Sequence, residues 1–179
     1  MQPSLYGAGA EYALHSLLLL ATRPEPASVR DLAVFQKIPE RFLAKLFTRL
    51  KKAGLVQGLE GVAGGFVLAR PAERIRVLDV LAAVDPDRTL FTCAEIRRQC
   101  ALYGPTPPEW ATAGRCRIHL FMGEAERVLQ EFLASKTLAD LVGEYESKAP
   151  PAFIQASGTW FRQRKGGRGA GQAGQRNQP

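Results

Sequence analysis

The order of three patterns between residues 28 and 69 constrains the fold of this chain more than any other feature of its 179 residues. The first pattern is Ser28 before an apolar-periodic run, with Asp31 three positions on, which is a capping arrangement that predicts a short helix. The second is a longer helix predicted from Pro39, because proline suits the first helical turn. Its apolar positions repeat with helical period and are Phe42, Leu43, Leu46, Phe47 and Leu50. Two helices joined by a tight turn predict a helix-turn-helix.

The opposite face of the longer helix is basic. It carries Arg41, Lys45, Arg49, Lys51 and Lys52. The second helix of a helix-turn-helix is the one that enters the major groove of DNA. We therefore predict that Arg41, Lys45 and Arg49 face DNA.

The third pattern is a pair of short β-prone runs, residues 55–59 and 65–69, on either side of a glycine-containing turn. Such runs predict a β-hairpin, and a hairpin directly after a helix-turn-helix is the wing of a winged helix. Helices are also predicted over residues 11–21 and 77–84, the latter ended by Asp85 and Pro86. We assign residues 1–86 to a winged helix-turn-helix DNA-binding domain, in a mainly α fold with a small β-hairpin wing.

All three cysteines lie in one segment. Cys93, Cys100 and Cys116 are followed by His119, and the glycines and prolines between them predict a loop rather than a helix or strand. Thiolates favour zinc, copper(I) or iron-sulfur centres, so residues 87–117 are a candidate sensor loop with a soft-metal site. The alternative is three unligated thiols, because free cysteine often packs as a small hydrophobe.

Residues 118–150 predict a long helix followed by a short one that Thr137 and Asp140 cap. The apolar positions of the long helix recur three and four residues apart, as in a coiled-coil seam. They are Ile118, Phe121, Ala125, Val128 and Phe132. A seam of this kind packs either inside its own chain or against a second copy.

Residues 151–179 lose this periodicity and carry five basic and no acidic side chains, all five from Arg162 onward. We predict a disordered basic tail. The net charge of +7 is spread as +5 over residues 1–76, −3 over residues 77–161 and +5 over residues 162–179. A basic front and a basic end favour a polyanion partner for the two ends of the chain. The tail can add salt-sensitive attraction to DNA or can simply aid solubility.

Residues 38–56, 61–71 and 75–85 together resemble the IscR/NsrR-type, or Rrf-two, family of bacterial transcription regulators. The resemblance covers about residues 8–145. It implies a homodimeric winged-helix DNA binder with a long dimerisation helix, and therefore favours a dimer through the apolar seam. It also implies, for many members, an iron-sulfur cluster held after the wing, and the positions that match its ligands are Cys93, Cys100 and Cys116. The predicted DNA-binding residues are Ser28, Pro39, Arg41, Lys45, Arg49, Lys52, Gly64 and Gly65.

Three thiolates leave a cluster or a zinc ion one ligand short. One candidate is His119, which follows Cys116 at a short chelating step and matches a position from which some relatives supply a histidine. The other is Glu11 or His15, four residues apart on one helix face, because in some relatives this helix reaches the cluster of the partner subunit. Both candidates stay open at this stage.

The function that these observations favour is a homodimeric transcription regulator that binds double-stranded operator DNA at promoters. Its binding would be modulated by an iron-sulfur cluster or by the redox state of the cysteine loop, with a two-iron two-sulfur cluster favoured over a four-iron cluster or zinc. The alternatives are a cluster-free or zinc-bound winged-helix regulator, and a winged-helix module for protein or RNA contacts. We expect no enzyme, because no paired carboxylates, phosphate loop or nucleophile-base motif stands out. An odd number of cysteines without an export signal or membrane span predicts a cytoplasmic protein without a membrane partner.

Overall fold

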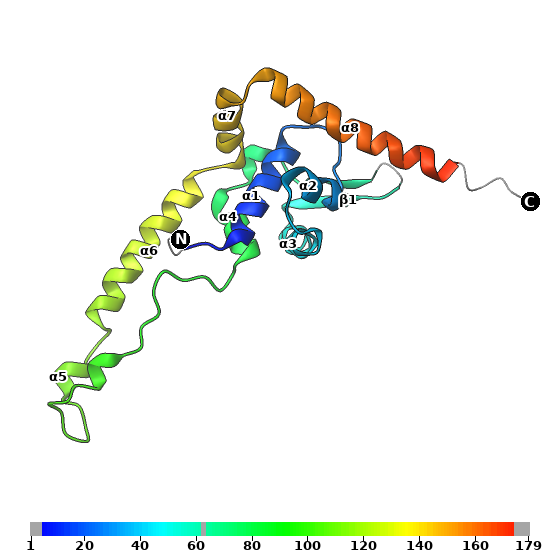
Figure 1. The fold of residues 1–179 in the computed structure, drawn as a ribbon. Helices are drawn as coiled ribbons and strands as arrows, with labels where there is room; N and C mark the ends of the chain where they lie inside the picture. The colour runs from blue at the N-terminus through cyan, green and yellow to red at the C-terminus, as the bar shows by residue number, and fades with distance from the viewer. Residues whose placement is uncertain (1–4, 62–63, 174–179) are drawn as a thin grey trace, which may run out of the picture.

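A computed structural model of the chain describes residues 5–61 and 64–173, with side chains up to Lys165 (Figure 1). The elements in order are α1 (Ala8–Ala21), α2 (Val29–Gln36), α3 (Glu40–Lys52), β1 (Val56–Leu59), β2 (Gly65–Leu68), η1 (Ala72–Arg74), α4 (Val77–Val84), η2 (Ile96–Arg98), α5 (Glu109–Thr112), α6 (Arg117–Ser135), α7 (Leu138–Lys148) and α8 (Pro151–Ala173). The fold is mainly α with one antiparallel hairpin, as the sequence predicts. No helix among the described residues is both long and apolar enough to cross a membrane.

The helix-turn-helix is defined by local capping and by one shared core. The Ser28 hydroxyl accepts a hydrogen bond from the backbone N–H of Asp31 at 3.1 Å, which satisfies a free donor at the start of α2. Lys37, in the left-handed conformation, ends α2 and turns the chain into α3. The two helices and α1 then bury a common set of side chains. The fully buried members include Leu17, Leu32, Leu43, Phe47 and Leu50.

The wing is a two-stranded hairpin in which Val56 pairs with Leu68 and Leu59 with Gly65. A further bridge joins Ala27, just before α2, to Phe66, which anchors β2 to the helix-turn-helix. Gly65 has a φ of 151°, and a Cβ there would lie 2.7 Å from the carbonyl oxygen of Ala27. The close approach of β2 to Ala27 therefore requires glycine at position 65. Residues 62 and 63 of the turn lie outside the described residues.

The joint between α6 and α7 is attached to the domain by backbone hydrogen bonds. Val77 donates to the carbonyl of Lys136 at 2.8 Å, and Leu138 donates to the carbonyl of Ile75 at 2.8 Å. Thr137 and Asp140 form the predicted capping box at the start of α7. These bonds fix where α6 leaves the winged helix.

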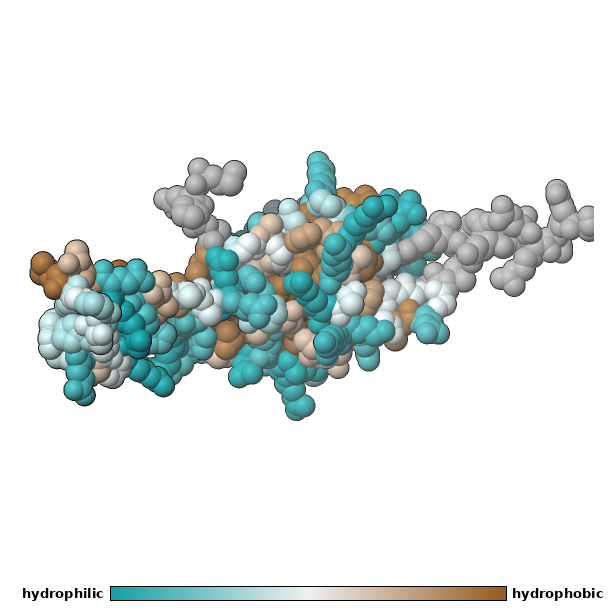
Figure 2. All heavy atoms as spheres, turned by 90° about the horizontal axis from the view of Figure 1, so that it is seen from below, coloured by the Kyte–Doolittle hydropathy of each residue, from teal (hydrophilic) through white to brown (hydrophobic). Residues whose placement is uncertain are grey.

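From this joint α6 and the cysteine segment form an arm that projects away from the winged helix, with η2 and α5 near its far end (Figure 1). The prediction that residues 87–117 are entirely loop is therefore incomplete, since two short helical turns interrupt it. Hydrophobic side chains gather at the end of the arm (Figure 2). The exposed ones there include Ile96, Leu102 and Trp110.

The prediction of a disordered tail is wrong over residues 151–173, which form α8; residues 174–179 lie outside the described residues. The physical reason is a patch of aromatic side chains. Phe161 is only 8% exposed and packs against Phe35 of α2, with ring centroids 5.0 Å apart. Trp160 also contacts Phe35, at 5.1 Å. One buried and one partly buried ring, packed against α2, stabilise a helix whose basic end has no apolar periodicity of its own.

We expect a Phe161→Ala variant to release α8 from the domain. Removing a buried phenyl group costs on the order of 3 kcal/mol of packing, and this loss falls on a terminal helix that can open without unfolding the core. Hydrogen exchange of residues 151–165 should accelerate, while that of α3 stays unchanged. Phe153→Ala is the matched control, because Phe153 is 50% exposed on the same helix. Equal exchange in both variants would contradict the docking of α8 through Phe161.

Candidate functional site

The exposed side of α3 is the first part of the candidate site. Pro39 is the N-cap of α3, and the helix buries Leu43, Leu46, Phe47 and Leu50 against the core. Its other face presents Arg41, Lys45 and Lys52, all exposed. Because α3 is strongly amphipathic, its apolar side faces the core and its cationic side faces solvent. A cationic helix face is suited to binding a polyanion such as DNA.

An open depression lies beside the start of α3. Its walls are Ala8, Tyr12, Pro39, Arg41, Phe42 and Lys45. Phe42, one of the apolar positions that repeat with helical period, is 41% exposed, and its ring lies edge-on to that of Tyr12, with centroids 5.8 Å apart. Phe42 thus lies at the border of the apolar stripe. An aromatic face between two cations can contact a thymine methyl or a sugar while the cations meet phosphates.

Arg49, the third cation of the α3 face, also contacts a neighbouring helix. Its guanidinium donates a hydrogen bond to the backbone carbonyl of Val84, the last residue of α4. A cation at a helix C-terminus satisfies a carbonyl that has no partner within the helix. Arg49 therefore joins α3 to α4 through one guanidinium nitrogen, while the residue as a whole stays exposed.

Ser28 and the wing glycines, which the sequence analysis predicts to bind DNA, also have structural roles. The Ser28 hydroxyl caps α2 and donates to the Asp31 carboxylate at 2.7 Å. A Cβ at Gly64 would collide with the carbonyl oxygen of Leu59. Both positions are thus required by the fold, whichever contacts with DNA they make.

Hydrogen bonds of Arg97 hold the two ends of the cysteine segment together. The sequence analysis did not single out this residue. Its guanidinium donates to the carbonyls of Ala113 at 3.3 Å and Gly114 at 2.7 Å, and to Glu95 at 2.8 Å. These bonds join the beginning of the segment to its end. The only signal in the sequence was an arginine between two cysteines, which carries no information about so distant a contact.

This closure brings Cys93 beside Cys116. The Cys93 thiol donates to the Glu95 carboxylate at 3.8 Å, and Cys116 lies close enough to Cys93 and to the backbone N–H groups of Ile118 and His119 for all three to lower its pKa. The N–H of His119 contributes most to lowering the pKa of Cys116 below its ordinary value, and the charge of Arg97 adds to it. A thiol at a helix N-terminus near a cation is favoured as thiolate, the form that binds metals.

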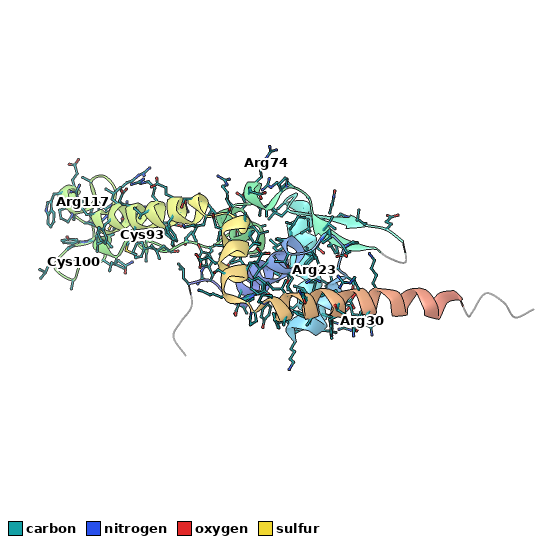
Figure 3. All side chains as sticks on the ribbon, turned by 90° about the horizontal axis from the view of Figure 1, so that it is seen from above. Arg23, Arg30, Arg74, Cys93, Cys100 and Arg117 are labelled. Carbon is teal, nitrogen blue, oxygen red and sulfur yellow. The ribbon has the colours of Figure 1, made fainter. Side chains whose placement is uncertain are left out.

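The remaining candidate ligands are not gathered around this pair. Cys100 is exposed on the same arm as Cys93 (Figure 3). His119 is exposed, with its ring 6.5 Å from that of Phe91. Glu11 and His15 line an open apolar hollow with Leu14, Leu18 and Leu141 on the winged helix. Within residues 5–61 and 64–173 no three His, Cys, Asp or Glu side chains converge as a metal site would need.

The donor set therefore fits an iron-sulfur cluster in its chemistry, and two of its thiols are already together. Cys100 lies in the stretch between η2 and α5, so moving it toward the pair breaks no long helix. Zinc would be held by the same thiolates.

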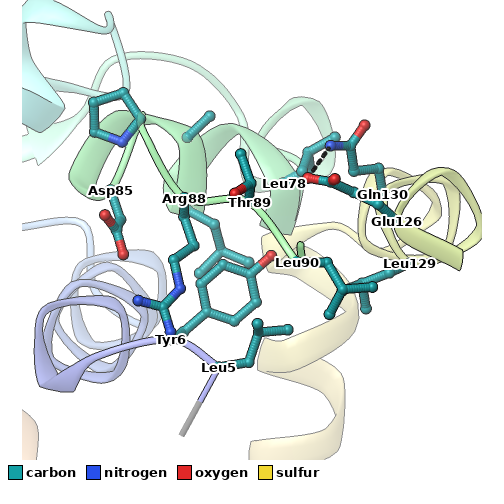
Figure 4. A pocket seen from close by; sticks show the side chains of 13 residues that line it. Leu5, Tyr6, Leu78, Asp85, Arg88, Thr89, Leu90, Glu126, Leu129 and Gln130 are labelled. Atoms are coloured by element: carbon teal, nitrogen blue, oxygen red, sulfur yellow. Dashed lines mark hydrogen bonds between the residues drawn. The ribbon is translucent and has the colours of Figure 1, made fainter. Parts of the chain in front are cut away.

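A small cavity of about 120 Å³ lies where the arm meets the domain (Figure 4). The N-terminal residues Leu5 and Tyr6, the end of α4 and the middle of α6 all line it. Thr89 and Leu90, which begin the cysteine segment, are part of the same wall. The beginning of the cysteine segment thus lines one cavity together with α4 and α6.

Comparison with known proteins gives one family. The sequence model of the Rrf2 family, described as "Iron-dependent Transcriptional regulator", matches residues 6–144. The HTH-type transcriptional regulator IscR of Xenorhabdus nematophila is 31% identical over 137 residues, which cover 75% of this chain and 77% of that protein. Protein rrf2 of Nitratidesulfovibrio vulgaris is 33% identical over 135 residues, covering 74% and 83%.

The structure of T. potens IscR aligns with a TM-score of 0.60 at 23% identity, over 87% of this chain and 96% of that one. This likeness supports the winged-helix fold. The relatives are transcription regulators and not enzymes, and the family model includes the helix-turn-helix, the wing, the cysteine segment and α6. The chain is therefore a DNA-binding transcription regulator of the Rrf2 family.

Proposed function

We propose that this protein binds operator DNA as a homodimer, reads it with α3, and adjusts that binding through its cysteine arm. The observation that carries the proposal is the exposed cationic face of α3, with Arg41 and Lys45 on either side of the partly exposed Phe42. A rigid core holds this face beside the wing. As a DNA-binding regulator with three free thiols, the protein is proposed to act in the cytoplasm.

The support for a homodimer is the apolar side of α6. Four of the five predicted seam residues are between 54% and 73% exposed, namely Ile118, Phe121, Val128 and Phe132, and Ala125 is half-buried. Leu133, on another side of α6, packs on the core of the winged helix. One face of α6 therefore serves the domain and the other is left uncovered by its own chain. A contiguous exposed apolar stripe is typical of an interface between subunits.

We further propose that Cys93, Cys100 and Cys116 hold an iron-sulfur cluster, with a two-iron two-sulfur centre favoured. His119, or Glu11 or His15 of the partner subunit, would complete the ligand set. When bound, such a cluster supplies a redox-active centre whose gain, loss or oxidation changes the charge at this end of α6. Arg97 and the first N–H groups of α6 stabilise the negative thiolates there. Cluster state would thereby bias the position of α6, and with it the spacing of the two α3 helices.

Arg41→Ala and Lys45→Ala test the DNA-binding face. Loss of a base contact should weaken operator binding by about 1–3 kcal/mol and relax specificity, and loss of a phosphate contact should lower the salt dependence by about one. Fluorescence anisotropy with operator and unrelated duplexes at several salt concentrations separates the two. Lys148→Ala is the control, since Lys148 is a highly exposed lysine at the end of α7. Unchanged affinity in both α3 variants would remove α3 as the reading helix.

A second candidate function is the same DNA-binding regulator with metal-free, redox-active thiols. The proximity of Cys93 and Cys116 favours it, because two thiols lie near each other without a metal. One visible absorption spectrum of anaerobically purified protein distinguishes the candidates. An iron-sulfur cluster absorbs visible light, whereas zinc and free thiols do not.

A further inference from the structure

The helix that follows the region matched by the family model brings a second group of cations to the helix-turn-helix. The match ends at residue 144, and α8 begins at Pro151. Gly158, Phe161, Arg162 and Lys165 lie on one face of α8 and line a small pocket with Arg23, Glu25 and Pro26. Three cations, from two distant parts of the chain, thus surround one hollow that contains a single carboxylate.

Arg23 is the innermost of these cations. Its Nε donates to the carbonyl of Leu19 at 2.6 Å, and its guanidinium stacks on the ring of Phe161 at 3.5 Å from the centroid. Its Nη1 is buried and has no hydrogen-bond partner. Burial lowers the pKa of Arg23 to about 10, although Glu25 opposes this shift. The hollow therefore contains a guanidinium whose charge and hydrogen-bond donors are only partly compensated.

The same helix is attached to the N-terminus of α2. Arg164 Nε donates to the Asp31 carboxylate at 3.0 Å, and its guanidinium lies over Trp160 at 4.8 Å. The Asp31 side chain is 4% exposed, so this ion pair helps to fix α8 in place. Arg30, the neighbour of Asp31, is exposed on the first turn of α2 (Figure 3). With Arg164 occupied by Asp31, the side chains left to meet a ligand are Arg162, Lys165 and Arg30.

We propose that the docked face of α8, through Arg162 and Lys165 beside Arg23 and Arg30, is a second DNA-binding surface that takes phosphodiester groups of the DNA backbone. The ligand is an oxyanion because three cations, Arg23, Arg162 and Lys165, outnumber the one carboxylate, Glu25, around the hollow. The DNA backbone is favoured as its source because the surface adjoins the N-terminus of α2, on the same domain that presents α3. The inference rests on the DNA binding described above and extends it to a part of the chain outside the family match.

The test is the salt dependence of DNA binding by an Arg162→Gln, Lys165→Gln double variant of the full chain. Loss of two phosphate contacts should make the plot of log affinity against log salt shallower by about 1.8. The affinity should fall by a similar factor on operator and unrelated duplexes, because phosphate contacts carry no sequence information. Lys148→Gln serves as the control for loss of a lysine elsewhere and should leave the slope unchanged.

A Glu25→Gln variant should change the DNA affinity in the opposite direction. Removing the one carboxylate of the hollow should strengthen DNA binding and steepen its salt dependence. Thermal unfolding of all variants, in chloride and in phosphate buffer of equal ionic strength, reports folding and free-anion binding separately.

Three results would overturn the proposal. An unchanged slope in the double variant shows that α8 makes no backbone contact. Tighter binding by the double variant shows that α8 covers the DNA site instead. Stabilisation of the parent by phosphate, lost in the double variant while DNA affinity stays the same, assigns the hollow to a free anion. These three results can be told apart from a failure of the proposal that α3 reads DNA. That failure would appear as unchanged affinity in Lys45→Ala, whatever the α8 variants show.

Discussion

A Val128→Asp variant is expected to sediment as a monomer where the parent protein is a dimer, and to lose at least two orders of magnitude in operator affinity. Val128 is 54% exposed in the single chain and lies at the centre of the α6 stripe. Burying an unpaired carboxylate between two such stripes costs several kcal/mol, and each 1.4 kcal/mol is about a factor of ten in affinity. The winged helix itself should stay folded, because Val128 is not part of its core.

Gly123→Asp is the matched control for this variant. It adds the same charge on the same helix, at an exposed position outside the stripe where an added side chain meets no neighbour. Sedimentation velocity should show the control as a dimer. A Val128→Asp protein that remains a dimer with parental affinity would show that the subunits do not associate through this side of α6.

The second large effect is expected from Cys116→Ser, which should abolish cluster assembly and change operator affinity. The backbone N–H groups of His119 and Ile118 and the charge of Arg97 lower the pKa of Cys116, which favours the thiolate form that binds metal. A serine hydroxyl at this position stays protonated and is a poor ligand for iron. After anaerobic reconstitution, iron content and visible absorption should fall close to zero, whereas circular dichroism stays parental.

Cys93→Ser and Cys100→Ser should give the same loss, and His119→Ala decides the fourth ligand. An unchanged spectrum in His119→Ala would favour Glu11 or His15 of the partner subunit as the fourth ligand. If all three serine variants retain parental iron and operator affinity, the cysteines have only a structural role. If colour disappears and affinity does not change, a cluster is present that does not regulate DNA binding.

The winged helix could be predicted from sequence because its signals are local. The Ser28 cap and the helical period of α3 each act within a few residues, and both appear in the structure as expected. The exposed apolar stripe of α6 follows from the same kind of periodicity. What the sequence did not reveal depends on contacts between distant segments.

Two examples show this difference. Arg49 has the same spacing as Arg41 and Lys45, yet its guanidinium meets a carbonyl 35 positions away. The rings of α8 look isolated among glycine, glutamine and arginine until Phe35 of α2 is beside them. Periodicity records which side of a helix is apolar, but it does not record which neighbour covers that side.

The arm has a mechanical consequence. Its cysteine pair lies at the start of α6, and the other end of α6 is bonded through Lys136 and Leu138 to the segment before α4. With 19 residues, α6 is a lever about 28 Å long, at roughly 1.5 Å per residue. A tilt of about 10° at the cysteine end therefore displaces the attached winged helix by about 5 Å. In a symmetric dimer both α3 helices would shift together, relative to successive major grooves that lie about 34 Å apart. In the proposed dimer, a small change in ligation at the far end of α6 would thus be amplified geometrically into loss or gain of register on DNA.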